Sequence, residues 1–246
     1  MLDAQEEATR RYYDEFAARY ERERGGRVPG GYHDLIDALE LEFLARYATG
    51  KRVLEVGCGT GLLLDQIARF AGSACGVDLS PAMLAQARAR GLDVAEASAT
   101  SLPFASGSFD AACAFKVLAH VPDVRRALAE MARVVVPGGI VVAEFYNLLS
   151  LRALAKRVGP AGRISATTTE AAAFTRFDPP WRIGALLPPG ARVVGRRGLR
   201  IVTPFAAALR LPLLGGALRA AERRLCDGPL GYLGGFWIAA IRTAQL

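Results

Sequence analysis

The stretch Arg52-Val53-Leu54-Glu55-Val56-Gly57-Cys58-Gly59-Thr60-Gly61 decides the fold of this 246-residue chain. Its first five residues form a short, largely aliphatic run that predicts a buried strand. The glycines at 57, 59 and 61 let the backbone turn sharply and approach a ligand without a Cβ clash. Residues 62–68 then follow a helical pattern. The stretch therefore predicts a strand, a glycine-rich turn and a helix.

The same alternation of strand and helix continues downstream. Strands are predicted at 74–78, 94–97, 109–115 and 139–146, and helices at 81–90 and 122–133. Ser80 can cap the first of these helices with Pro81 at its first position, and Pro122 starts the second. Alternating units of this length imply a parallel sheet with helices on both faces, whose ligands bind at the carboxyl ends of the strands.

Further segments flank this core. Amphipathic helices are predicted at 2–24 and 32–48, a basic helix at 148–158, a strand at 192–202, helical sequence at 205–225 broken at Leu211-Pro212, and a closing strand at 236–242. The long irregular part of 147–190 is interpreted as a lid or substrate-binding insertion. The predicted organisation is a helical cap (1–50), a core (51–146), the insertion (147–190) and a part that completes the sheet (191–246).

The composition argues against several other classes of protein. The longest stretch without a charged residue, 228–241, is shorter than the roughly 18 to 20 apolar residues that span a bilayer. The N-terminus is acidic and lacks the apolar segment of a secretory signal, so we expect a cytoplasmic protein without a transmembrane helix. The four cysteines include no C-x-x-C pair and the chain has two histidines, so neither a disulfide framework nor a metal site is expected.

The net charge of +7 is unevenly distributed. Residues 1–150 hold 16 basic and 20 acidic residues, net −4, whereas residues 151–246 hold 15 and 4, net +11. The basic part could meet an acidic substrate, a membrane surface or nucleic acid. The chain also has 28 Arg and only 3 Lys, a bias that a GC-rich coding sequence produces without a functional demand. Both interpretations stay open.

Two carboxylates lie where a ligand would meet such a sheet. Glu55 lies two residues before Gly57, where its side chain can face an amino group. Asp78 ends the next strand, 17 residues after Gly61, where an acidic side chain can accept both hydroxyls of a ribose.

Four motifs together make the chain resemble the class I S-adenosylmethionine-dependent methyltransferases, in the subfamily of small-molecule and quinone methyltransferases. They are VLEVGCGTG at 53–61, GVDLSPAML at 76–84, LPFASGSFD at 102–110 and RVVVPGG at 133–139. The resemblance covers about ninety residues, from 52 to 143. It implies a Rossmann-like, seven-stranded, mostly parallel sheet with a helical cap and an insertion after the fifth strand. It also implies S-adenosylmethionine as cofactor and S-adenosylhomocysteine as product.

The resemblance further implies roles for individual residues. Gly57 and Gly59 would pack against the methionine moiety, whose ammonium Glu55 would hold, and Asp78 would bind the ribose. Leu79 and Met83 would lie near the adenine, Ala99 would offer it a backbone amide, and Lys116 would place its backbone near the methionine tail. The family usually has Asp where this chain has Ser98. A serine can still bond the exocyclic amine, so weaker recognition of the adenine is expected.

Tyr20 and His120 have two open interpretations each. Tyr20 in the first helix closes over the cofactor, or it only forms part of a half-buried helix face. His120 just after the fourth strand is the best general-base candidate, because an unperturbed histidine pKa near 6.5 suits that work. It would otherwise pack against or cap the next helix. Tyr146 is the second candidate for a polar contact with the acceptor, near Glu144 and Asn147.

The expected reaction is transfer of a methyl group to a small organic acceptor, with oxygen favoured over nitrogen or carbon and secondary metabolism as one setting. The basic insertion, with Arg152, Arg157 and Arg163, favours an anionic or lipophilic acceptor. A quinone or lipid C-methyltransferase at the membrane surface, using the basic amphipathic stretch 205–225, is the alternative. So is a binding module that has kept the fold without catalysis. The oligomeric state is left open.

Other enzyme classes fit the sequence less well. Nicotinamide dehydrogenases have G-x-G-x-x-G, and this chain has Leu62 at the last position. Asp178-Pro179-Pro180-Trp181 resembles the tetrapeptide of amino-methylating DNA and RNA enzymes, but there it follows the fourth strand directly. The arginines of the C-terminal part have few aromatic residues between them, so a nucleic-acid partner is not expected.

Overall fold

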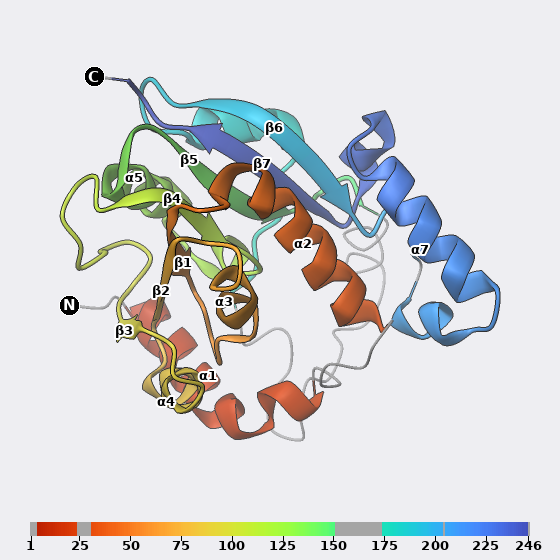
Figure 1. Cartoon of the computed structure of the whole chain (residues 1–246), viewed down its shortest axis with the longest axis horizontal. Helices are drawn as coiled ribbons and strands as arrows, with labels where there is room; N and C mark the ends of the chain where they lie inside the picture. The colour runs from red at the N-terminus through yellow and green to blue at the C-terminus, as the bar shows by residue number, and fades with distance from the viewer. Residues whose placement is uncertain (1–3, 24–30, 151–173, 204, 246) are drawn as a thin grey trace.

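The computed structural model of the chain describes residues 4–23, 31–150, 174–203 and 205–245. A single sheet of seven strands runs through it in the order β3-β2-β1-β4-β5-β7-β6 (Figure 1). The strands are β1 (Arg52–Val56), β2 (Ser73–Asp78), β3 (Val94–Glu96), β4 (Phe109–Ala114), β5 (Val135–Tyr146), β6 (Arg192–Leu199) and β7 (Phe236–Arg242). Only β7 runs antiparallel to its neighbours. The predicted Rossmann-like, mostly parallel sheet is confirmed.

Helices cover both faces of the sheet. They are α1 (Ala4–Glu23), α2 (Tyr32–Ala48), α3 (Leu62–Ile67), α4 (Pro81–Ala89), α5 (Val124–Val134) and α7 (Leu214–Leu225), with 3-10 helices η1 (Leu118–His120), η3 (Pro180–Leu186), η4 (Ala206–Arg210) and η5 (Pro229–Leu233). None of the described helices is long and apolar enough to cross a membrane.

The core has two layers because successive side chains of a strand point to opposite faces. On one face, Val53 of β1 and Val142 of β5 pack against Leu39 and Phe43 of α2. On the other, alternate residues of the same strands pack against the apolar side of α5. Most residues of the central strands β1, β4 and β5 are therefore buried.

Most predicted elements agree with the structure, and the differences have local causes. The helix predicted at 122–133 begins at Val124, because Asp123 is the cap: its carboxylate accepts from the N–H of Arg126 at 3.0 Å. β5 begins at Val135 rather than at residue 139, beside an irregularity in β4 between Phe109 and Ala111. The stretch 205–225 is η4 and α7, separated at 211–213. Most of the predicted helix 148–158 lies outside the described residues, and the division into four parts stays a prediction.

Helix α1 lies against α4, beside the carboxyl ends of β2 and β3 (Figure 1). The carboxylate of Asp14 accepts from the hydroxyl of Ser80 at 2.5 Å and from the N–H of Ala82 at 3.2 Å, at the first turn of α4. The side-chain amide of Gln86 donates to the carbonyl of Ala17 at 2.7 Å. These bonds place α1 over the edge of the sheet where a ligand is expected.

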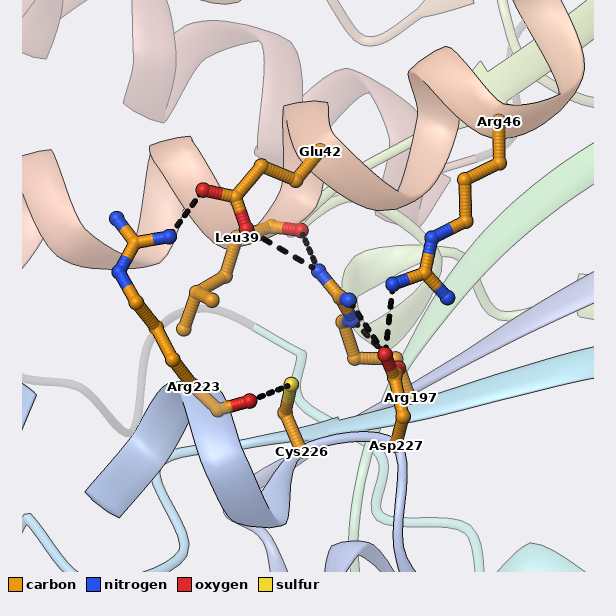
Figure 2. A network of polar contacts seen from close by, with 7 residues as sticks. All are labelled: Leu39, Glu42, Arg46, Arg197, Arg223, Cys226 and Asp227. Carbon is orange, nitrogen blue, oxygen red and sulfur yellow. Dashed lines mark hydrogen bonds and ion pairs between the residues drawn. The ribbon is translucent and has the colours of Figure 1, made fainter. Parts of the chain in front are cut away.

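A second polar network joins α2 to the C-terminal strands (Figure 2). Arg197 of β6, only 3% exposed, donates to both carboxylate oxygens of Asp227 at 2.8 and 2.7 Å and to the carbonyl of Leu39 at 2.9 Å. Arg46 of α2 also donates to Asp227, at 2.6 Å, and Glu42 pairs with Arg223 of α7. A buried guanidinium needs such partners, so the network fixes α2 against β6.

Candidate functional site

A cavity of about 620 Å³ opens at the carboxyl ends of β1, β2, β4 and β5, with residues of α1 forming part of its wall. All twelve residues predicted for the site line it: Tyr20, Glu55, Gly57, Gly59, Asp78, Leu79, Met83, Ser98, Ala99, Lys116, His120 and Tyr146. Residues that are far apart in the sequence thus share one cavity, as the topology requires. Their individual roles stay predictions.

The glycine-rich turn shapes one wall of this cavity. Gly57 has φ +75°, and a Cβ built on it would lie 2.1 Å from Cγ2 of Val117. Gly59 has φ +53°, and a Cβ there would meet nothing within 4 Å. Only glycine adopts these conformations without strain. Gly57 therefore permits the close approach of two chain segments, and Gly59 keeps the backbone open toward the cavity.

Asp78 is fixed at the end of β2 by backbone donors. Its carboxylate accepts from the N–H of Gly59 at 2.8 Å and from the N–H of Ser80 at 2.9 Å. Burial raises the pKa of Asp78, and these backbone hydrogen bonds oppose the increase. The hydroxyl of Ser80 in turn accepts from the N–H of Met83 and caps α4. The carboxylate is thus oriented before any ligand binds. This suits a group that accepts hydrogen bonds from hydroxyls.

A group of buried charges lies beneath the turn. Lys116 has φ +61°, and its ammonium lies 3.1 Å from the carboxylate of Asp37 and 2.8 Å from that of Glu40, both on α2. Glu144 is buried beside Glu40, and burial followed by the charge of Glu40 raises its pKa. Sequence reasoning assigned only the backbone of Lys116 and missed Asp37 and Glu40, because nothing local in an amphipathic helix shows that two acids will be buried.

Glu55 is the carboxylate of this group that lines the cavity. It is 2% exposed, and its Oε2 has no hydrogen-bond partner in the described part of the chain. Burial, then the charge of Glu40, raises its pKa well above the ordinary value. An unsatisfied buried carboxyl oxygen calls for a donor, and an ammonium is the donor that also compensates charge. The residues present therefore fit the amino group of S-adenosylmethionine.

A further carboxylate reaches the cavity from α1. Glu6 lines the cavity and accepts a hydrogen bond from Ser98. The same carboxylate oxygen accepts from the hydroxyl of Thr100 at 2.9 Å. Ser98 thus contacts an acidic residue of a different element, and the expected weaker recognition of the adenine stays a prediction. No motif could have indicated Glu6.

Aromatic side chains form the remaining wall. Tyr13, Phe16 and Tyr20 of α1, together with Phe115 and Tyr146 of the sheet, line it. Such a wall suits a flat, apolar ligand with a few polar groups. Burial raises the pKa of Tyr13, so its hydroxyl is protonated at neutral pH.

His120 lies at this wall with a defined ring orientation. Its Nδ1 is 2.8 Å from the carbonyl oxygen of Phe174, and its ring stacks edge-on against Tyr146 at 5.8 Å between centroids. A carbonyl oxygen can only accept, so Nδ1 carries the proton. In the neutral ring, Nε2 then bears the lone pair. This is the tautomer that a general base requires.

Three expectations near the site are corrected or lie outside it. Asn147 does not face the acceptor, because its buried amide donates to the carbonyls of Tyr232 and Gly234 at 2.7 and 2.8 Å. Asp178 pairs with Arg176 at 2.8 Å in a turn remote in sequence from β4, and Trp181 is 67% exposed, so the tetrapeptide is not a catalytic motif. The insertion arginines 152, 157 and 163 lie outside the described residues. Within those residues no group of three or more metal-ligating side chains occurs.

Comparisons with known proteins bear on the same part of the chain. Residues 54–143 match the model of a family described as "Methyltransferase domain". The ubiquinone biosynthesis O-methyltransferase of Alkalilimnicola ehrlichii is 36% identical over 145 residues, which are 55% of this chain and 58% of that protein. The enzyme of the same name from Hahella chejuensis is 38% identical over 112 residues, 42% of this chain and 47% of that one. The chain thus spans about half the length of these relatives.

Solved structures share the fold over a longer part. A SAM-dependent methyltransferase of Thermotoga maritima has a TM-score of 0.68 at 20% identity, over 94% of this chain and 98% of that one. Phosphoethanolamine N-methyltransferase 2 of Haemonchus contortus, in complex with S-adenosyl-L-methionine, has a TM-score of 0.63 at 19% identity, over 100% of this chain and 61% of that one. At these identities the likeness concerns the fold.

Proposed function

We propose that this chain is a class I S-adenosylmethionine-dependent methyltransferase and that it transfers a methyl group to an oxygen of a small aromatic acceptor; the match of residues 54–143 to a methyltransferase domain supports the class. The observation that carries the proposal is the cavity at the strand ends, where an unsatisfied buried carboxyl of Glu55 and the oriented carboxylate of Asp78 meet across a glycine turn. The relatives named as ubiquinone O-methyltransferases support oxygen as the atom methylated.

The chain's part in cofactor binding follows from these groups. Glu55 would hold the ammonium, Asp78 would accept the ribose hydroxyls, and Gly57 and Gly59 would leave room for the methionine chain. When bound, the cofactor supplies an electrophilic methyl group on a sulfonium. The transfer itself is an in-line displacement, so the protein chiefly supplies proximity and orientation.

The chain's part toward the acceptor is to hold it and to take its proton. The aromatic wall of Tyr13, Phe16 and Tyr146 orients a flat acceptor by stacking and by excluding water. Nε2 of His120 would accept the proton that the acceptor hydroxyl loses when it is methylated. A phenol is the acceptor class that fits an aromatic wall beside a base.

Calorimetric titration with S-adenosylmethionine and S-adenosylhomocysteine tests the cofactor. Micromolar binding that weakens at least about tenfold in Asp78→Ala is expected, since the variant removes two charge-assisted hydrogen bonds. A screen of catechols, hydroxybenzoates and quinols with labelled methyl donor then tests the reaction. Failure of folded protein to bind either cofactor form refutes the proposal, and binding without turnover of any acceptor favours the binding module.

A lipophilic acceptor taken from a membrane surface is the second candidate. The loop 211–213 between η4 and α7 exposes Leu211 and Leu213, the latter to 93%, and it is flanked by the exposed Arg210 and Leu214. Exposed apolar residues beside a cation suit an anionic lipid surface. Flotation with vesicles that contain anionic lipid, compared between the natural chain and Leu213→Asp, tests it: binding that the variant loses supports the membrane candidate, and equal absence of binding supports an acceptor from solution.

A further inference from the structure

Helix α1 brings a carboxylate to a wall of the cavity that otherwise consists of apolar and hydroxyl side chains. Beyond β2 and β3 this wall is formed by Leu79, Met83, Ala97 and Ala99, with Ser98 between the two alanines. Glu6 reaches it from α1 and takes hydrogen bonds from Ser98 and Thr100 on one carboxylate oxygen. The hydroxyl of Ser98 also accepts from the N–H of Thr100 at 3.1 Å, which fixes its direction.

This arrangement favours a ligand that donates a hydrogen bond. A carboxylate can only accept hydrogen bonds, and two hydroxyls that both point at Glu6 offer no donor to a ligand at that place. Apolar walls beside an acceptor suit a flat heterocycle with an exocyclic amine. A heterocycle with a carbonyl at the same position would bring two acceptors together, which costs binding energy.

We propose that Glu6 reads the exocyclic amine of the cofactor's adenine and thereby couples cofactor binding to the docking of α1. The inference rests on the proposed function, since it takes S-adenosylmethionine as the ligand. It assigns to a residue of the first helix the role for which the chain has only the neutral Ser98 on the sheet.

The contacts of α1 explain why recognition of the adenine amine by Glu6 is coupled to the docking of α1. Behind Glu6 the helix is fastened to α4 by Asp14 on Ser80, by Gln86 on Ala17 and by the ion pair of Glu21 with Arg90. Helix α4 begins at Pro81, shortly after Asp78, which is the residue proposed to bind the ribose. One adenosine moiety would therefore contact both the start of α4 and the first turns of α1, so that its binding favours the docked position of α1.

The test compares S-adenosylhomocysteine with S-inosylhomocysteine, in which a carbonyl replaces the amine. Calorimetric titration uses the natural chain, Glu6→Gln and the control Glu15→Gln, which changes an exposed acid of the same helix. The natural chain and the control should prefer the adenosyl ligand about 10- to 100-fold. In Glu6→Gln the preference should fall to about threefold or less, because the glutamine amide can also donate to a carbonyl.

Hydrogen exchange supplies a readout that does not depend on activity. S-adenosylhomocysteine should slow amide exchange in residues 4–23 of the natural chain and of Glu15→Gln, and slow it clearly less in Glu6→Gln. Unchanged discrimination in Glu6→Gln, with tight adenosyl binding by the natural chain, overturns the role of Glu6 and leaves the proposed function standing. Absence of binding by the natural chain overturns both.

Discussion

The glycine-rich turn offers a test in which stability and ligand binding separate. In Gly57→Ala, a residue with φ +75° gains a Cβ, which costs about 1–2 kcal/mol of backbone strain. The same Cβ would lie 2.1 and 2.8 Å from the two Cγ atoms of Val117, and overpacking of this kind costs about 1–3 kcal/mol. The free energy of unfolding should therefore fall by about 2–5 kcal/mol.

Gly59→Ala is the matched control, because its Cβ meets nothing within 4 Å. Only the strain remains, so its loss of stability should be about 1–2 kcal/mol. The stabilising effect of Gly→Ala on the unfolded chain is common to both variants and cancels in the comparison. The new methyl group of Gly59→Ala faces the cavity, so this variant should lose affinity for S-adenosylhomocysteine while it keeps most of its stability.

Urea unfolding followed by circular dichroism measures these differences. Val117→Ala removes both Cγ atoms and leaves Val117 Cβ, at 3.0 Å, as the nearest contact. The double variant Gly57→Ala/Val117→Ala should therefore recover about 1–3 kcal/mol relative to the sum of the single variants. Equal destabilisation by Gly57→Ala and Gly59→Ala, or additivity in the double variant, would refute the reasoning from close approach.

Three further predictions concern the charged and titrating groups. His120→Gln should lower kcat about 10²- to 10⁴-fold and leave the Kd of S-adenosylhomocysteine within about twofold, and an unchanged kcat in a labelled-methyl assay would exclude the base role. Two guanidinium groups lower the pKa of Asp227 to about 2, so its stabilisation is complete above its ordinary pKa and is lost as pH falls toward 2. Its side chain is 41% exposed, so we expect about 1 kcal/mol, seen as a flatter acid limb of the unfolding curve for Asp227→Asn between pH 2 and 4; parallel acid limbs would contradict this. Burial raises the pKa of Glu55 and a bound ammonium should lower it, so ligand binding should release protons over the pH range in which Glu55 titrates. This is measured as a dependence of the calorimetric enthalpy on buffer ionisation that Glu55→Gln abolishes. No such dependence in the natural chain would show that Glu55 is already ionised.

The part of this structure that could be predicted from sequence is the part set by local chemistry. α2, β1 and β7 begin and end at the predicted residues, since hydrophobic periodicity and flanking glycines are read within one segment. The candidate site residues on strand ends and turns were found for the same reason: parallel strands carry their carboxyl ends to one edge. All of them line one cavity.

What could not be predicted depends on how distant helices dock. Glu6 and Asp14 lie on an ordinary amphipathic helix, and only the position of α1 against α4 brings them to Ser98 and Ser80. Asn147 was expected at the acceptor because it follows β5, but its amide donates to the carbonyls of Tyr232 in η5 and of Gly234 just after it. Spacing along the chain contains neither piece of information.

The uneven distribution of charge along the chain is another feature that the sequence could not explain, and the structure explains part of it. The acidic first part and the basic last part of the chain meet at α2. Its acidic residues form ion pairs with two different sets of partners. Asp37 and Glu40 face Lys116 at the cavity, whereas Glu42 faces Arg197 and Arg223 of the C-terminal part. Some of the C-terminal excess is thus neutralised inside the molecule and is not available to an acidic partner. Helix α2 also supplies the ion-pair partners of Lys116, which lies beside Glu55. One helix therefore holds both the C-terminal strands and the floor of the cavity. This suits a site whose groups must be oriented before the ligand binds.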